Sequence, residues 1–371
     1  MDGAVAASVP GGTFLTLGHA AALAAVARAV QRQRPPHALL LVGPRGVGKT
    51  TLAFDLAAGL LCLRDEPASR PCRDCAACRK VEADNHADLH LIAPEGAGEQ
   101  IRIGQIQRLV TDLALTAMEG RFRVAVITAA QRLNLDAQNA LLKTLEEPGP
   151  ATCLVLCADD AAPLLPTVLS RSARLRLAPL PIEALARQLA ADGLAQPAQA
   201  RALALASAGR PGLARRLLDA PEAVLARSRI GRTLLDLVDA DNRRRLAAAA
   251  DLITDAAAFE AALRGEVAST SRRLQPVERR RALQVIIEVW RDVGRDLAVA
   301  ARGDGRAIRD LDQLEELARA AGRIEAPSLH RFLDRLDRLS LAVEGYASPE
   351  LTLDALLLSW PRPTRAGRSA A

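Results

Sequence analysis

The segment Gly43-Pro44-Arg45-Gly46-Val47-Gly48-Lys49-Thr50 fits the phosphate-loop pattern G-x-x-x-x-G-K-[ST]. An apolar run typical of a buried strand, residues 38–42, comes directly before it, and residues 51–61 after it have the apolar spacing of a helix. The pattern therefore lies where backbone N–H groups and a helix dipole can bind phosphate. A glycine-rich turn without a ligand is the alternative, but the register of strand, loop and helix favours a nucleotide site.

Two side chains of this segment have expected roles in nucleotide binding. Lys49 is expected to reach the β- and γ-phosphates, and the Thr50 hydroxyl to ligate Mg²⁺. The ligand expected here is ATP or ADP with Mg²⁺. The predicted nucleotide-binding residues are Gly43, Pro44, Arg45, Gly46, Val47, Gly48, Lys49, Thr50 and Thr51.

Composition limits the class of protein. Half of the 371 residues are apolar and only 2% are aromatic, so the core must consist of Leu, Ala and Val, which favours helices. The net charge of +6 is compatible with a nucleic-acid partner, although Arg residues beside Asp and Glu fit a salt-bridged surface equally well. We find no signal peptide pattern and no run of about 18 apolar residues, so we expect a cytoplasmic protein without membrane contact.

Four cysteines follow the predicted loop helix in the spacing C-x9-C-x2-C-x2-C: Cys62, Cys72, Cys75 and Cys78. In a chain without a secretory signal, this spacing favours tetrahedral thiolate coordination of Zn²⁺ over disulfides. The charged segment 63–71 contains two prolines and cannot build a core, so a metal would fix it. Free or redox-active thiols are the alternative. Four protein ligands leave no position for a catalytic water, so the expected zinc site is structural.

Further strands are expected over residues 88–93, 122–128, 152–158 and 174–177, with helical segments between them. This alternation predicts an α/β fold with a parallel, doubly wound sheet. One intervening helix is expected to start at an N-cap Asp136 and to stop before Pro148.

The strand expected over 122–128 ends in Thr128 and Ala129. At this position phosphate-loop ATPases normally carry an acidic pair that holds Mg²⁺ and activates water. Because both carboxylates are missing, we expect ATP to be bound but hydrolysed weakly or not at all.

Beyond residue 177 the strand pattern stops. Three short helices are expected within 179–221, followed by a linker at Ala220-Pro221-Glu222. Residues 222–360 have the pattern of a helical bundle with breaks near 303–305 and 326–328, and the tail 361–371 is expected to be disordered.

The phosphate loop, the four-cysteine insert, the segment 139–148 (NALLKTLEEP) and Leu169-Ser170-Arg171 together resemble the bacterial clamp-loader branch of the AAA+ ATPases. The resemblance covers roughly residues 10–220. It implies an AAA+ domain with a zinc module at 62–78 over residues 1–178, a three-helix lid over 179–221 and an all-α collar, or oligomerisation domain, over 222–371. The resemblance also implies that the chain is part of the DNA polymerase III holoenzyme without polymerase activity of its own.

Within this family the chain resembles a stator more than a motor. Motor subunits of the gamma/tau kind keep the acidic pair and a nucleotide-sensing lid arginine, and this chain has Thr128-Ala129 and Gly212 at those positions. The resemblance implies gamma/tau and delta subunits as partners in a hetero-pentameric ring, with the sliding clamp and primer–template DNA reached through the assembly. It also implies that Arg171 serves as an arginine finger in trans.

Alternatives to this interpretation remain open. A self-sufficient motor is disfavoured by the missing acidic pair, and a zinc module that reads nucleic acid directly is disfavoured by the scarcity of aromatic residues. The alternative role for Arg171 is that of a surface arginine that caps a helix C-terminus, which needs only a positive charge.

Overall fold

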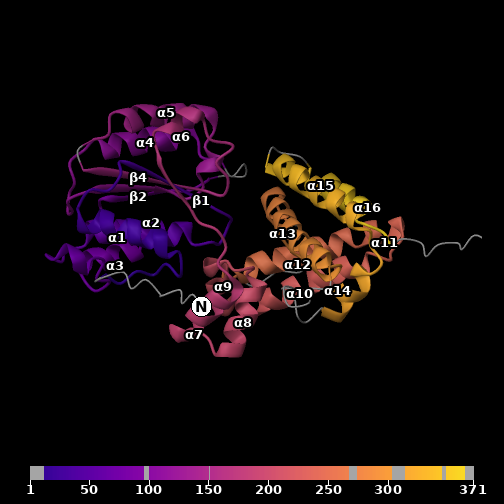
Figure 1. Ribbon diagram of the computed structural model, residues 1–371. Coiled ribbons are helices and arrows are strands. Elements are labelled where there is room, and N and C mark those ends of the chain that lie inside the picture. The colour runs from indigo at the N-terminus through magenta and orange to yellow at the C-terminus, as the bar shows by residue number, and fades with distance from the viewer. Residues whose placement is uncertain are drawn as a thin grey trace, which may run out of the picture. The chain divides into compact units, whose positions relative to one another are not determined.

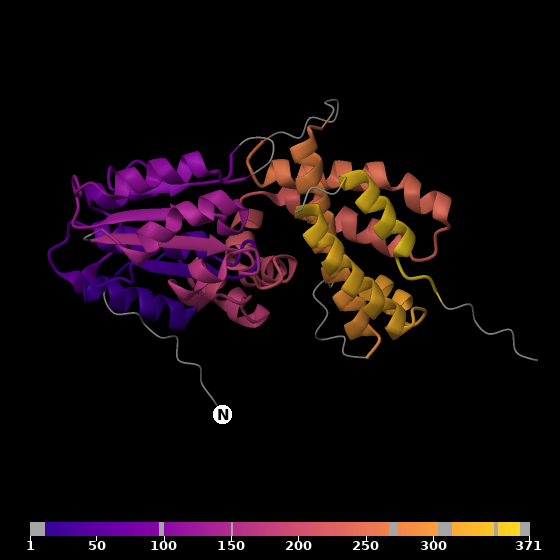
Figure 2. The same ribbon diagram turned by 90° about the horizontal axis from the view of Figure 1, so that it is seen from above.

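The computed structural model describes residues 12–95, 100–149, 151–266, 274–302, 314–344 and 348–363. The chain divides into two compact units, drawn in Figures 1 and 2. The amino-terminal unit consists of Met1–Ala204 and Gly209–Leu213, and the carboxy-terminal unit of Leu205–Ala208 and Ala214–Ala371.

The amino-terminal unit is built on a five-stranded parallel sheet, which confirms the predicted α/β fold with a parallel sheet. The strand order is β2-β3-β4-β1-β5. The three inner strands are apolar and buried on both faces, as a parallel sheet requires. The strands are β1 (Ala38–Val42), β2 (Leu89–Ile92), β3 (Arg123–Ile127), β4 (Thr152–Ala158) and β5 (Ala173–Arg176).

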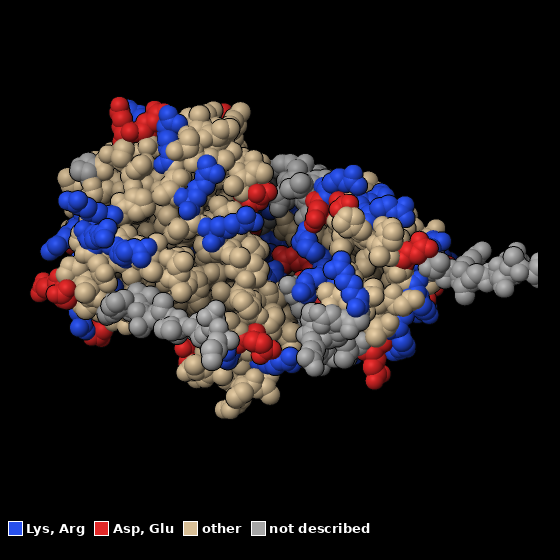
Figure 3. All heavy atoms as spheres, viewed as in Figure 1, with Lys and Arg blue, Asp and Glu red and all other residues tan. Residues whose placement is uncertain are grey.

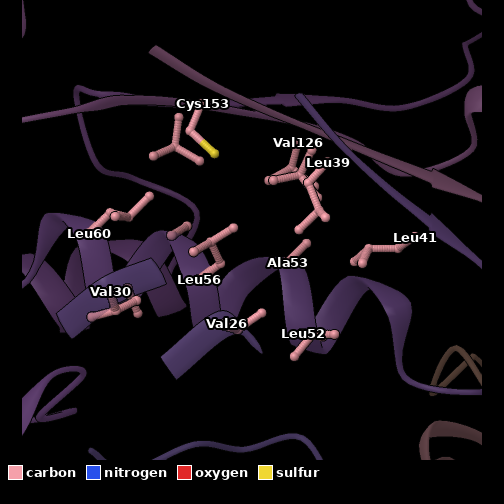
Figure 4. Packing of buried hydrophobic residues seen from close by; sticks show 14 of the residues in the cluster. Val26, Val30, Leu39, Leu41, Leu52, Ala53, Leu56, Leu60, Val126 and Cys153 are labelled. Carbon is pink, nitrogen blue, oxygen red and sulfur yellow. The ribbon is translucent and has the colours of Figure 1, made fainter. Parts of the chain in front are cut away.

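Helices cover both faces of this sheet (Figure 1). Strand residues alternate between two cores: Leu39 and Leu41 face the helices on one side, and Leu40 faces those on the other. Figure 4 shows the first core, in which strand side chains meet Leu52 and Leu56. The first face carries α1 (Ala20–Gln31), α2 (Lys49–Leu61) and α3 (Ala76–Glu82), and the second α4 (Ile103–Leu113), α5 (Leu135–Glu146) and α6 (Pro166–Ser170).

Two local expectations are wrong. The N-cap of α5 is Asn134, whose Oδ1 accepts from Ala137 N at 2.9 Å, so Asp136 lies in the first turn instead. The expected linker at Ala220-Pro221-Glu222 is the start of a helix, α10 (Pro221–Asp236), because proline at the first helical position has a suitable φ and needs no donor.

Short helices follow β5 where three were expected: α7 (Ile182–Ala191), α8 (Pro197–Ala206) and α9 (Pro211–Leu218). The division between the two compact units falls within this segment. The limits 179 and 221 of the expected lid therefore stay predictions.

Among the described residues from 214 onward, every regular element of the carboxy-terminal unit is a helix. Trp290, Phe332 and Trp360 form an aromatic cluster in its core, with ring centroids 4.7 to 5.4 Å apart. The expected break at 303–305 and the tail from residue 364 lie outside the described residues. Besides α10, the helices are α11 (Asn242–Ala247), α12 (Ala249–Ala262), α13 (Pro276–Ala300), α14 (Leu314–Ala321), α15 (Ala326–Glu344) and α16 (Pro349–Ser359).

A fully buried arginine, Arg245, joins the two ends of this helical unit. Its guanidinium donates to Val238 O at 3.1 Å, beyond the end of α10, and to Pro361 O at 3.2 Å, beyond the end of α16. Burial lowers the pKa of Arg245. Carbonyl oxygens at helix ends carry partial negative charge, and they compensate the buried cation here.

Charged side chains of both signs occur on the visible face of each unit (Figure 3). Ion pairs such as Lys80–Glu119, at 2.7 Å, fit the salt-bridged surface that the composition allowed. Among the helices of the described residues, none combines the length and apolar character needed to cross a membrane.

The carboxylate of Asp55, in the middle of α2, is completely buried. It accepts hydrogen bonds from Leu15 N at 3.0 Å and from the backbone and hydroxyl of Thr16, and it pairs with Arg73 of the cysteine segment. Burial raises the pKa of Asp55, and the hydrogen bonds and the charge of Arg73 oppose that rise. One side chain thus connects the loop helix, the segment before α1 and the cysteine segment.

Replacing Asp55 with Asn should lower the free energy of unfolding by about 3 kcal/mol, because the guanidinium of Arg73 would lose its buried partner. Denaturant unfolding followed by far-ultraviolet circular dichroism measures this change. Asp65→Asn, at an exposed position, is the matched control and should change stability by less than about 0.5 kcal/mol. Equal effects of the two variants would contradict the structural role of Asp55.

Candidate functional site

The nine predicted nucleotide-binding residues form one strand–loop–helix element. The loop leaves the carboxyl end of β1 at Gly43, and α2 begins at Lys49. A Cβ at Gly43 would lie 2.1 Å from Leu177 O, so only glycine allows the residue after β5 to pass this close. Gly48 has a φ of 107°, a conformation that side-chain-bearing residues rarely adopt. The glycines therefore serve the loop geometry as the sequence pattern predicts.

The ammonium of Lys49 is buried and bound to three oxygens. Its Nζ donates to Gly43 O at 2.5 Å, to Pro44 O at 3.1 Å and to Asp159 Oδ1 at 2.7 Å. Asp159 directly follows β4, the neighbour of β1 in the sheet. Asp159 could not be predicted from the sequence, because no local pattern encodes the adjacency of these two strands.

Amide and hydroxyl groups follow β3, at the position where the sequence has no acidic pair. The Thr128 hydroxyl donates to Ile92 O at 3.3 Å and so points toward β2. Gln131 binds Asp159 twice: its Nε2 donates to Asp159 Oδ2 at 3.1 Å, and its Oε1 accepts from Asp159 N at 3.2 Å. The nearest carboxylate to Lys49 in this group therefore comes from the end of β4 and not from β3.

Two further segments pack against the phosphate loop. Leu213 N, near the start of α9, donates to Gly46 O at 3.1 Å, and a Cβ at Gly212 would lie 3.0 Å from the same oxygen. His19, which precedes α1, donates from Nε2 to Val47 O at 2.9 Å, and burial lowers the pKa of its ring. The expected lid position Gly212 thus lies at the loop.

The four predicted metal-ligating cysteines come together. All four Sγ atoms of Cys62, Cys72, Cys75 and Cys78 lie within 4.8 Å of one another, so the group could hold a metal ion. The Sγ of Cys72 lies 3.6 Å from that of Cys62 and 3.9 Å from that of Cys78, far longer than a disulfide bond.

Backbone N–H groups support the sulfurs of this cysteine cluster. Cys75 N donates to Cys72 Sγ at 3.3 Å, and Cys78 N donates to Cys75 Sγ at 3.4 Å. Burial would raise the pKa of Cys72, but hydrogen bonds from backbone N–H groups and from neighbouring thiols lower it to about 6. Burial raises the pKa of Cys62 and Cys78. Backbone N–H groups therefore favour the thiolate form of Cys72.

Arg171 lies at the amino ends of the strands, opposite the carboxyl ends where the phosphate loop begins. Its backbone oxygen accepts from the ring of His37, just before β1, at 3.1 Å, whereas the phosphate loop follows the opposite end of β1. Five strand residues separate these ends by about 16 Å. The guanidinium of Arg171 pairs with Glu146 at 2.8 Å and donates to Thr167 O at 3.2 Å, which is also the contact of a helix C-cap.

Residues 18–181 match the family model described as "DNA polymerase III, delta subunit". The delta-prime subunit of DNA polymerase III from Pseudomonas aeruginosa is 40% identical over 188 residues, or 50% of this chain and 57% of that protein. The tau subunit from Escherichia coli is 36% identical over 167 residues, or 45% of this chain and 25% of that protein. These relatives confirm the predicted resemblance to clamp-loader subunits, and the matches span only part of their length.

A solved structure of a DNA polymerase III gamma subunit-related protein from Thermotoga maritima is a more distant neighbour. It has a TM-score of 0.44 and 16% identity, over 90% of this chain and 96% of that chain. A likeness this distant does not bear on function.

Replacing Gly212 with Ala should destabilise the amino-terminal unit by about 1 kcal/mol, because the added methyl group would crowd Gly46 O. Gly104→Ala is the matched control: Gly104 is likewise the second residue of its helix, and a Cβ there meets nothing within 4 Å. That control should leave stability unchanged or raise it by about 0.5 kcal/mol. Thermal unfolding of both variants measures the difference, and equal shifts would contradict the close contact.

Proposed function

We propose that this chain is a clamp-loader subunit of DNA polymerase III, of the delta-prime kind, which binds nucleotide without turning it over and acts on the nucleotide of a neighbouring subunit. The observation that carries the proposal is the match of its amino-terminal half to a delta-prime subunit at 40% identity. The residues around the phosphate loop support the proposal that the chain binds nucleotide but does not hydrolyse it.

ATP or ADP with Mg²⁺ is the proposed ligand of the phosphate loop. The N–H groups of the loop and the start of α2 would bind phosphate oxygens, Lys49 would pair with the β- and γ-phosphates, and the Thr50 hydroxyl would hold Mg²⁺. The tight loop made possible by Gly43 and Gly48 fits such a ligand.

Hydrolysis needs a group that activates water, and the end of β3 offers none. Thr128 is engaged with Ile92, and Gln131 with Asp159. Neither a hydroxyl nor an amide is a base at neutral pH, so neither side chain can take a proton from water. The chain would therefore hold nucleotide as a structural ligand.

Arg171 is proposed to act in trans. Phosphoryl transfer spreads negative charge over the γ-phosphate oxygens, and a guanidinium from another subunit can stabilise it. The distance of about 16 Å along β1 keeps Arg171 away from the phosphate loop of its own chain. Glu146 at 2.8 Å would hold the guanidinium ready at the amino edge of the sheet.

The proposed assembly is a hetero-pentameric ring with gamma/tau and delta subunits, which reaches the sliding clamp and primer–template DNA as a whole. Residues 179–221 would serve as the lid and residues 222–371 as the collar that holds the ring together. The helical character of the described part of the carboxy-terminal unit is compatible with a collar.

A motor subunit of the gamma/tau kind is the second candidate. The complete phosphate loop and the 36% identity to a tau subunit favour it. The missing acidic pair after β3 weighs against it.

The cysteine cluster is proposed to bind one structural Zn²⁺. Zinc–sulfur bonds of about 2.3 Å in a tetrahedron place sulfurs about 3.8 Å apart. Three of the six sulfur–sulfur separations, at 3.6 to 3.9 Å, fit this geometry, and all six lie within 4.8 Å. The metal would fix a segment that has little core of its own, and Arg73 within it would be held against Asp55.

Protein purified without added zinc should contain one Zn²⁺ per chain by elemental analysis. Cys75→Ser should lose the metal and make residues 62–78 sensitive to protease, because three ligands hold zinc far less tightly than four. Cys153→Ala, which removes a buried cysteine outside the cluster, should retain the metal. A metal-free native protein would end the zinc proposal.

In a loader reconstituted with its other subunits, Arg171→Ala in this chain alone should abolish the hydrolysis at the site that it serves. The loss there should be about 10³-fold, and Arg171→Lys should not restore it. Clamp- and DNA-stimulated phosphate release by the assembly measures the effect. The isolated chain, wild type or variant, should release phosphate negligibly.

Arg174→Ala is the matched control for this experiment, because Arg174 is a nearby exposed arginine that donates to Leu169 O. It should leave hydrolysis by the assembly unchanged. If Arg171→Ala also leaves it unchanged, Arg171 only caps α6 and the mechanism in trans is wrong.

A further inference from the structure

Asp159 contacts the phosphate-loop lysine and has no part in the function proposed above. Its Oδ1 accepts from Lys49 Nζ at 2.7 Å. The Lys49 side chain is 6% exposed, whereas that of Asp159 is 43% exposed. The carboxylate therefore lies at the outer side of the ammonium, where a ligand in solution would approach.

Gln131 fixes the orientation of this carboxylate. It donates to Asp159 Oδ2 and accepts from the backbone N–H of Asp159, so Oδ1 is left to face Lys49. The two side chains come from the segments that follow two neighbouring strands, β3 and β4.

The hydrogen bonds of Lys49 leave no donor free for a phosphate. An ammonium group has three N–H donors, and Gly43 O, Pro44 O and Asp159 Oδ1 take all three. A phosphate oxygen can gain a hydrogen bond from Lys49 only if one of these acceptors gives way. The two carbonyl groups are fixed by the loop, so Asp159 is the acceptor that must move, and its negative charge also repels the phosphate.

We propose that Asp159 is an affinity-determining residue of the nucleotide site, whose carboxylate competes with the nucleotide phosphates for the ammonium of Lys49. This inference rests on the nucleotide binding proposed above. The nucleotide site would therefore bind nucleotide less tightly than the same phosphate loop would without the carboxylate of Asp159.

The opposite role for Asp159 is that of a Mg²⁺ ligand that replaces the acidic residues missing after β3. A metal ligand strengthens binding only when Mg²⁺ is present, whereas a competitor for Lys49 weakens binding with or without the metal. The dependence on Mg²⁺ therefore separates the two roles.

The test is calorimetric titration of the full-length chain with ADP, once with Mg²⁺ and once with a chelator. Asp159→Asn should tighten binding about fivefold under both conditions, the size expected for a partly exposed ion pair. Asp159→Ala should do the same, which excludes a gain that comes only from the amide of Asn donating to phosphate. Asp160→Asn is the matched control, since Asp160 is exposed and accepts from Ala162 N, and it should change affinity less than about twofold.

Weaker binding of Asp159→Asn in Mg²⁺ alone would make Asp159 a metal ligand and overturn the inference. Unchanged affinity under both conditions, with a wild type that binds, would also overturn it and leave the proposed function intact. If neither the wild type nor the variants bind ADP, the nucleotide site proposed above fails together with this inference. Unchanged thermal unfolding of each variant checks that it is folded.

Discussion

The buried carboxylate of Asp55 is the contact on which the arrangement of the amino-terminal unit depends. It lies six residues beyond Lys49 on the same helix, about 9 Å along the axis. Because one rigid helix carries both side chains, the position of the loop lysine is tied to Leu15, Thr16 and Arg73. Through Arg73, the cysteine segment therefore contacts the same helix that carries the loop lysine.

The parallel sheet separates two kinds of chemistry in this unit. At the carboxyl ends of its strands, Asp159 accepts a hydrogen bond from the ammonium of Lys49 and another from Gln131. The amino edge of the sheet carries Arg171 and Glu146. Parallel strands place all their carboxyl ends on one side of the sheet and all their amino ends on the other. The segments that follow the strands and those that precede them therefore lie on opposite sides.

The features that the sequence alone could predict are local ones. The phosphate loop and the cysteine cluster depend on spacing along a few residues, and the alternation of strands and helices shows in apolar periodicity. The sequence predicts Asp136 as the N-cap in place of Asn134, because both residue types suit an N-cap and only the backbone decides between them. Asp159 and the contact of Gly212 with Gly46 could not be predicted, since both depend on strand order and chain packing. The sequence predicts a linker at Ala220-Pro221-Glu222, although proline also starts helices.

The aromatic cluster of the carboxy-terminal unit has a practical consequence for spectroscopy. The chain has two tryptophans, and both of them, Trp290 and Trp360, are buried in that cluster with their ring centroids 5.4 Å apart. Intrinsic tryptophan emission therefore monitors the helical unit and carries no direct signal from the sheet or the phosphate loop. Emission and circular dichroism together can consequently distinguish the melting of one unit from that of the other without any label.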